Sequence, residues 1–159
     1  MERQWMSRDK FDEVLEETLG YVVRVGDATS QLINVAILFA LGKQIEEQVG
    51  MINFILIFVS TAITGAVAYQ ILASGNPAPM VGASGGVFGF FGFLKGKELF
   101  FRLKNHLTIL PFLNLVFGLV VLHIVLILLH PSIIPFQIGW HGHLGGFVFG
   151  VLLAGVIKE

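Results

Sequence analysis

Long apolar runs alternate with short polar segments along most of this chain. The runs cover residues 32–41, 51–73, 81–94, 107–129 and 138–157. A helix that crosses a bilayer needs about 20 predominantly apolar residues. Lipid cannot hydrogen-bond to backbone groups, so spanning segments satisfy those groups internally as helices. The pattern therefore predicts an all-α, polytopic membrane helical bundle with about five transmembrane helices, of which the first and third are short.

The residues before the first run are polar or amphipathic. Their apolar members at helical spacing share one face: Phe11, Val14, Leu15 and Leu19. The segment is acidic and lacks the basic start of a signal peptide. We therefore expect two parts, an amphipathic N-terminal arm over residues 1–27 and a membrane domain over residues 28–159.

Composition agrees with lipid as the solvent. The chain has 159 residues, of which 55% are hydrophobic and 13% charged, whereas soluble domains carry about 25% charged residues. It has no cysteine, which excludes disulfides and thiolate metal sites. We expect the lipid bilayer as a partner, and we expect no cofactor, no metal and no nucleic acid. The oligomeric state does not follow from the sequence.

Basic residues indicate the orientation of the helices in the membrane. Lys43, the segment 95–104 and Lys158 fall on one side, whereas the opposite loops, 74–80 and 130–137, contain no Lys or Arg. Lys and Arg concentrate in cytoplasmic loops. The basic segments are therefore predicted to be cytoplasmic and the N-terminal arm to lie outside.

A candidate nucleophile opens the third apolar run, on the non-cytoplasmic side. The motif is Gly82-Ala83-Ser84-Gly85. Small flanking residues let a reacting carbonyl approach Ser84, and free N–H groups at a helix start can hold an oxyanion. The alternative is helix packing, because Gly85 and Gly89 form a Gly-x-x-x-Gly face. For Ser84 considered alone, packing is the stronger explanation.

A candidate base opens the fifth run on the same side, in the motif His141-Gly142-His143. A serine hydroxyl needs a base to act as a nucleophile, and His143 is suited to that role. The alternative is a neutral histidine bonded to a carbonyl. Two histidines at this spacing point to different helix faces, so they do not predict a metal site. His123 and His130 are expected to be structural or interfacial.

Asn34 lies at the start of the first run, also on the outer side. Its amide could donate a hydrogen bond to a developing oxyanion. An interhelical hydrogen bond or a position at the helix start would explain it equally well.

Taken in order, these motifs resemble those of the rhomboid family of intramembrane serine proteases, over about residues 30–157. The Ser84 motif with Gly89 is similar to the family's nucleophile helix, and His143 with the glycines after it is similar to the general-base helix. Asn34 falls where the family carries an oxyanion asparagine. The family's cytoplasmic turn, Gly-x-x-x-Glu-x-x-x-Gly, matches Gly42, Glu46 and Gly50.

The resemblance implies a Ser–His dyad without an acid, which hydrolyses peptide bonds of transmembrane protein substrates. Ser84 would attack, His143 would accept its proton, and the Ser84 backbone N–H and Asn34 would stabilise the oxyanion. Phe88 occupies the place of an aromatic residue that packs on the base. We expect a multi-pass protein of a prokaryotic inner (plasma) membrane.

Two departures from the family pattern keep a second interpretation open. Ser30 stands where the family usually has a histidine, although its hydroxyl could still donate to the oxyanion. The usual first helix is not among the apolar runs. The alternative is a catalytically silent rhomboid-like protein that binds transmembrane segments of client proteins.

Overall fold

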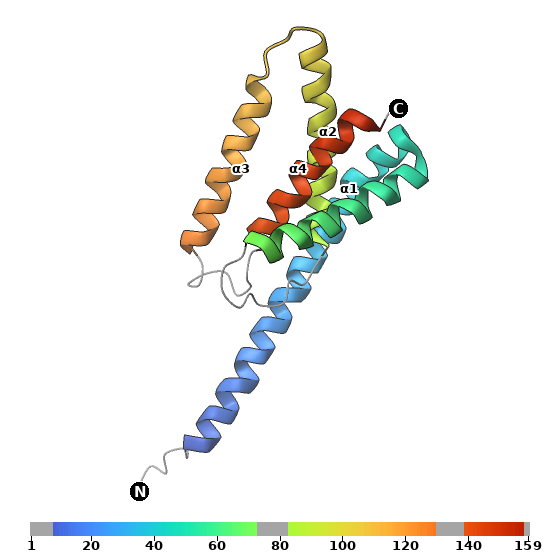
Figure 1. The fold of residues 1–159 in the computed structure, drawn as a ribbon. Helices are drawn as coiled ribbons and strands as arrows, with labels where there is room; N and C mark the ends of the chain where they lie inside the picture. The colour runs from blue at the N-terminus through green and yellow to red at the C-terminus, as the bar shows by residue number, and fades with distance from the viewer. Residues whose placement is uncertain (1–7, 73–82, 130–138, 158–159) are drawn as a thin grey trace, which may run out of the picture.

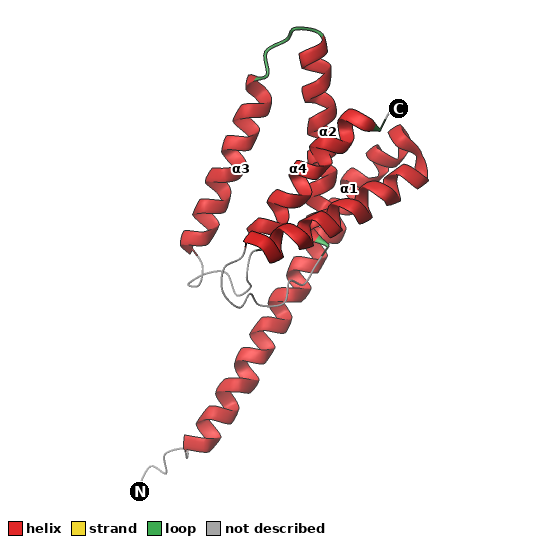
Figure 2. Cartoon of the chain, in the orientation of Figure 1, coloured by secondary structure: helices red, strands yellow, loops and turns green. Residues whose placement is uncertain are grey.

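The computed structural model describes residues 8–72, 83–129 and 139–157, with side chains described from residue 31 onward except at 126 and 129. This part of the chain forms helices and no strand (Figures 1 and 2). The helices are α1 (Arg8–Leu72), α2 (Ser84–Lys104), α3 (Leu110–Leu129) and α4 (Trp140–Val156). The predicted all-α class is confirmed.

Helix α1 consists of two helical segments that meet at Gly50. This residue has φ 78° and ψ 162°, a conformation that residues with a Cβ rarely adopt. After it the chain turns back, as the change from cyan to green in Figure 1 shows. A Cβ on Gly42 would lie 3.2 Å from the Phe54 ring, so the two segments pack against each other. The described chain thus has four helices, fewer than the five predicted, because two apolar runs share α1.

The helices extend beyond the apolar runs that predicted them. Helix α1 starts at Arg8 and continues past residue 41 to Gly50. The predicted N-terminal arm is therefore continuous with the first apolar run, although residues 1–7 lie outside the described residues and no side chain of the arm is described. Helix α2 continues past residue 94 to Lys104.

The extension of α2 is stabilised by charge pairs. Lys95 Nζ lies 3.0 Å from Glu98 Oε2, and Arg102 Nε lies 2.9 Å from Glu98 Oε1. Hydrogen bonds from Lys95 and then Arg102 hold the pKa of Glu98 below its ordinary value. Lys97 Nζ donates to the carbonyl of Ile157 at 2.9 Å. This bond ties the basic end of α2 to the end of α4.

Helices α2 and α4 pack with their backbones in contact. A Cβ on Gly146 would overlap the carbonyl oxygen of Gly85, and a Cβ on Gly150 would overlap that of Gly89. The contacts advance by one turn on both helices together, so the helices run in parallel. Contact between backbones of this kind is typical of small-residue motifs in membrane helices. The packing interpretation of Gly85 and Gly89 is therefore confirmed, and it leaves a catalytic role for Ser84 open.

The buried core lies between both segments of α1, α2 and α4. Its members are Ile45, Val49, Ile57, Phe90, Phe93 and Ala154. Thr61 is also fully buried, with its hydroxyl donating to the Ile57 carbonyl at 2.7 Å. Gly89 packs directly on Thr61.

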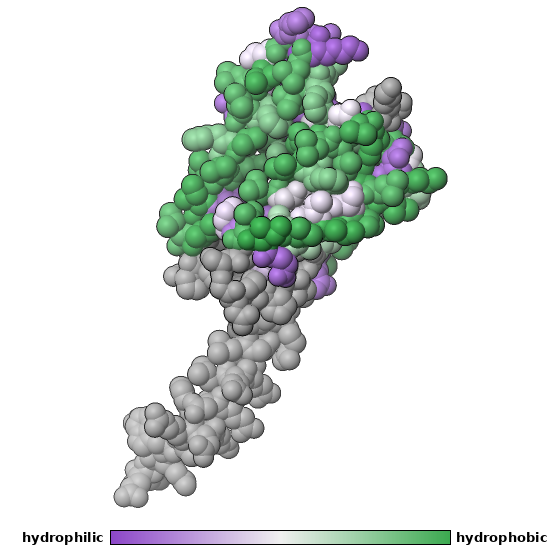
Figure 3. All heavy atoms as spheres, viewed as in Figure 1, coloured by the Kyte–Doolittle hydropathy of each residue, from purple (hydrophilic) through white to green (hydrophobic). Residues whose placement is uncertain are grey.

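The outer surface is mostly apolar. Large hydrophobic side chains on α1 and α3 are exposed, for example Phe39 at 84% and Leu128 at 77%. Figure 3 shows a broad hydrophobic belt, with hydrophilic residues gathered over the connection between α2 and α3. The segment Gln31–Leu72 is long and apolar enough to cross a membrane, and Leu110–Val125 and Trp140–Val156 are shorter apolar helices. An exposed apolar area of this extent needs lipid or protein around it.

Candidate active site

Ser84 is the first residue of α2 and is partly buried. The first helical hydrogen bond runs from the Val87 N–H to the Ala83 carbonyl at 3.0 Å. The amides before it, on Ser84, Gly85 and Gly86, have no carbonyl within the helix to bond. Together with the helix dipole, such amides favour a negative charge next to Ser84.

His143 lies in the first turn of α4. Its backbone N–H donates to the Gly139 carbonyl at 3.2 Å. The starts of α2 and α4 meet on the second segment of α1. A Cβ on Gly65 would lie 2.8 Å from the Gly142 carbonyl oxygen and 3.1 Å from the Gly85 Cα. Gly85 and Gly142 directly neighbour Ser84 and His143 in sequence. The two predicted residues therefore lie in the first turns of two parallel helices, at the same end of both.

The His143 ring stacks on Phe88. Their ring centroids are 4.2 Å apart and the rings are inclined by 8°. Phe88 follows Ser84 by one helical turn, so both residues lie on the same face of α2. Among the described residues no hydrogen bond joins Ser84 to His143. Catalytic hydrogen bonds are often long in a protein without substrate, so this geometry is compatible with a dyad.

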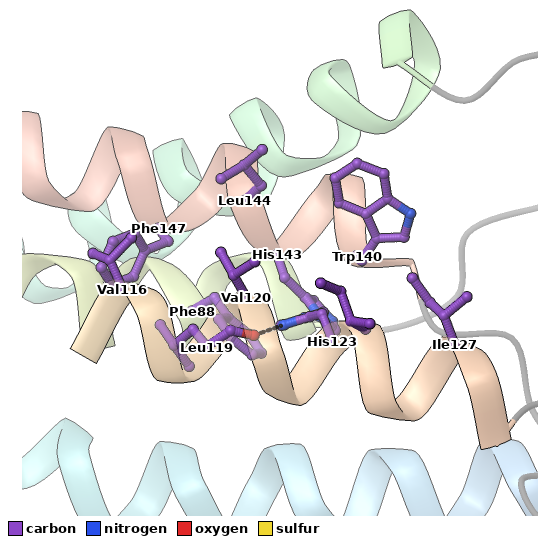
Figure 4. Close-up of a pocket in the computed structure, with 11 residues that line it drawn as sticks. Phe88, Val116, Leu119, Val120, His123, Ile127, Trp140, His143, Leu144 and Phe147 are labelled. Atoms are coloured by element: carbon purple, nitrogen blue, oxygen red, sulfur yellow. Dashed lines mark hydrogen bonds between the residues drawn. The ribbon is translucent and has the colours of Figure 1, made fainter. Parts of the chain in front are cut away.

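His123 of α3, which the sequence predicts to be structural or interfacial, is a neighbour of His143. Its Nε2 lies 3.1 Å from His143 Nδ1, and its Nδ1 lies 2.8 Å from the Leu119 carbonyl oxygen. Figure 4 shows the two histidines meeting at the edge of a pocket, with the Leu119 bond dashed. One feature of the sequence pointed to a functional role for His123. His123 is the only ionisable side chain within residues 107–129, and ionisable residues inside membranes are usually functional.

The pocket beside the two histidines has a volume of about 340 Å³. Phe88, His123 and His143 form one part of its lining, and the rest comes from apolar side chains of α3 and α4 such as Val120, Leu144 and Phe147 (Figure 4). An apolar cavity next to a candidate base suits an apolar side chain of a substrate. The two histidines are the groups here that could bind a metal, and among the described residues no third ligand joins them.

Asn34 has a buried side-chain nitrogen, Nδ2, that finds no hydrogen-bond partner in the described part of the chain. The structure therefore does not provide the interhelical hydrogen bond that would have explained this residue. Leu38, one turn further along α1, packs on the core that contains Phe90 and Phe93 of α2. Ser30 belongs to α1, one turn before Asn34, but its side chain lies outside the described residues.

Comparison with known proteins agrees with the resemblance noted from the sequence. The model of the Rhomboid domain family matches residues 20–159. The rhomboid protease GluP of Bacillus subtilis (strain 168) is 28% identical over 130 residues, which cover 78% of this chain and 22% of that relative. The chain therefore spans less than a quarter of the length of this relative. No solved structure matches the chain.

Proposed function

The chain belongs to the rhomboid family of membrane proteins, and we propose that it is an intramembrane serine endopeptidase that hydrolyses peptide bonds of transmembrane substrates. The observation that carries the proposal is the meeting of the first turns of α2 and α4, where Phe88 supports the His143 ring one turn from Ser84. The proposal includes a multi-pass arrangement in the inner membrane of a bacterium, in keeping with the bacterial relative.

In the proposed reaction Ser84 Oγ attacks the scissile carbonyl and passes its proton to His143 Nε2. The resulting tetrahedral intermediate collapses when His143 returns that proton to the leaving amine, which leaves an ester on Ser84. His143 then removes a proton from water, and the water attacks the ester. As the bond between the acyl carbon and Ser84 Oγ breaks, His143 returns its proton to Ser84 Oγ, which releases the new carboxyl end and restores the hydroxyl.

The oxyanion of that intermediate needs donors that are in place before it forms. The backbone N–H of Ser84 is one, because the first turn of α2 leaves it without a helical partner. Asn34 is the second, and its Nδ2, which has no partner among the described residues, supports this role. A buried donor without a partner costs about 1–3 kcal/mol, a cost that is understandable if a substrate oxygen completes the bond. Ser30 is the third candidate donor.

The second candidate function is binding of client transmembrane segments without catalysis. Ser30 in place of the usual histidine favours it, and so does the lack of a hydrogen bond between Ser84 and His143 in the described structure. The apolar pocket beside His143 would serve a client helix as well as a substrate.

Labelling by a fluorophosphonate probe separates the two functions. We expect the full chain, purified and reconstituted in lipid, to be labelled covalently, and Ser84→Ala and His143→Ala to lose the label. Ser60→Ala is the matched control. Ser60 lies within a helix, its hydroxyl donates to the Leu56 carbonyl at 2.6 Å, and it should not react with the probe. A folded protein that is not labelled, or that keeps the label in Ser84→Ala, would rule out the protease.

A further inference from the structure

We propose that His123 is a positioning residue that selects the reactive tautomer of His143. The inference rests on the proposed function, because a tautomer matters only if His143 acts as a base. It extends the Ser–His pair to a chain of four groups: Ser84, His143, His123 and the Leu119 carbonyl. The last three are linked by the hydrogen bonds described above.

The chain of hydrogen bonds starts at the backbone. A carbonyl oxygen can only accept, so the contact between the Leu119 oxygen and His123 Nδ1 at 2.8 Å requires a proton on that nitrogen. A neutral imidazole carries one N–H, so Nε2 of His123 has a lone pair and no proton. The carbonyl of Leu119 thereby determines the tautomer of His123.

The same reasoning carries over to His143. Its Nδ1 lies 3.1 Å from His123 Nε2, and since His123 Nε2 is an acceptor, His143 Nδ1 must hold the proton and donate it. The lone pair of His143 is then on Nε2. In serine hydrolases that use a triad, the orienting carboxylate likewise holds a proton on Nδ1 and leaves Nε2 to act on the serine.

During the reaction His123 keeps its own proton. The proton of Ser84 Oγ moves to His143 Nε2, which makes His143 an imidazolium with both nitrogens protonated. His143 Nδ1–H continues to donate to His123 Nε2 and so stabilises that cation. The face of the Phe88 ring, stacked at 4.2 Å, adds a cation–π attraction. When His143 releases the proton to the leaving amine, His143 and His123 return to their starting protonation states, and Ser84 carries the ester until water hydrolyses it.

A neutral acceptor suits this position in a membrane. A carboxylate would be costly to bury there, and residues 107–157 contain no Asp or Glu. The acceptor comes from α3, across the apolar pocket from α4. The orientation of the base therefore depends on a helix other than those that carry Ser84 and His143.

The tautomer of His143 can be measured by nitrogen NMR of the full chain labelled with ¹⁵N-histidine, at alkaline pH where histidines are neutral. His143→Ala assigns the signals by difference. We expect the Nδ1–H form in the wild type and in His123→Gln, whose side-chain oxygen can accept the same bond. His123→Leu should give a mixture of tautomers. The same tautomer of His143 in the wild type and His123→Leu would overturn the inference.

Activity gives the second readout. Loss of a residue that orients a metal-bound histidine costs about 10–100-fold in affinity or activity. By analogy, fluorophosphonate labelling of His123→Leu should slow by about 10–100-fold, with recovery in His123→Gln. Leu122→Ile, which changes an exposed side chain next to His123 at constant volume and outside the pocket lining, should label at the wild-type rate. Equal rates in wild type and His123→Leu would overturn the inference. A wild type that does not label would instead overturn the proposed function, and the NMR result would still decide the role of His123.

Discussion

Among the described residues, the buried side-chain nitrogen of Asn34 has no hydrogen-bond partner, and it lies on the turn of α1 that precedes the core contact of Leu38. If that nitrogen serves the oxyanion, Asn34→Ala should lower the turnover number by about 10²–10³-fold. Stability should not fall, because no hydrogen bond among the described residues is lost. Turnover of a transmembrane peptide substrate and thermal unfolding in detergent measure the two effects.

Asn53 provides the matched control for that substitution. It lies on α1 as well, but its Nδ2 donates to the Val49 carbonyl at 2.9 Å. Asn53→Ala should therefore lower stability by about 0.5–1.5 kcal/mol and leave turnover unchanged. If Asn34→Ala behaved in the same way, with lower stability and full turnover, a role in the oxyanion site would be wrong.

The residues of the candidate site differ in how far the sequence could identify them. Ser84 and His143 each open an apolar run beside glycines, and these signals are local. The partnership of His123 with His143 depends on how α3 is rotated about its axis. Residues 107–129 are apolar on every side and give no periodicity from which that rotation follows. His123 was therefore visible as an isolated histidine but not as a neighbour of the base.

Among the elements, α1 depends on the unusual backbone of Gly50. A Cβ there would meet no atom within 4 Å, so the cost of a side chain comes from φ 78° alone. Gly50→Ala should destabilise the protein by about 1–3 kcal/mol. Reversible unfolding in mixed detergent micelles measures this difference.

Gly118 on α3 is the control for Gly50. A Cβ there also meets nothing within 4 Å, and the residue has no positive φ. Gly118→Ala should be neutral or stabilise the helix by about 0.5–1 kcal/mol. Similar unfolding free energies for Gly50→Ala and Gly118→Ala would show that the break in α1 at Gly50 does not need a left-handed backbone.

The helix boundaries show what hydropathy can and cannot predict. Hydropathy located the two segments of α1 and the helices α2, α3 and α4, because lipid contact selects apolar residues. It placed the ends of the first and third too early, because a helix continues beyond the lipid wherever polar residues can pair. Lys43 and Glu47, one turn apart at 3.9 Å, extend the first segment in this way, and Glu98 does the same for α2.

For the whole molecule, the distribution of basic residues predicts which end faces the cytoplasm. The chain has no cysteine, so single cysteines can report accessibility. Asn105→Cys, in the exposed connection between α2 and α3, should react with a membrane-impermeant thiol reagent only after cells are permeabilised. Ser132→Cys, in the segment 130–137 that contains no Lys or Arg, should react in intact cells. The reverse pattern would contradict the predicted orientation.

The contact between α2 and α4 also limits how this protein can evolve. Every missense change at a glycine codon adds at least a Cβ, and at Gly146 and Gly150 that atom would collide with a backbone oxygen, which cannot rotate away. The exposed apolar positions of α1 and α3 face no such limit, and many aliphatic residues would serve there. Selection should therefore preserve a narrow line of glycines through the middle of the molecule while its lipid-facing surface drifts.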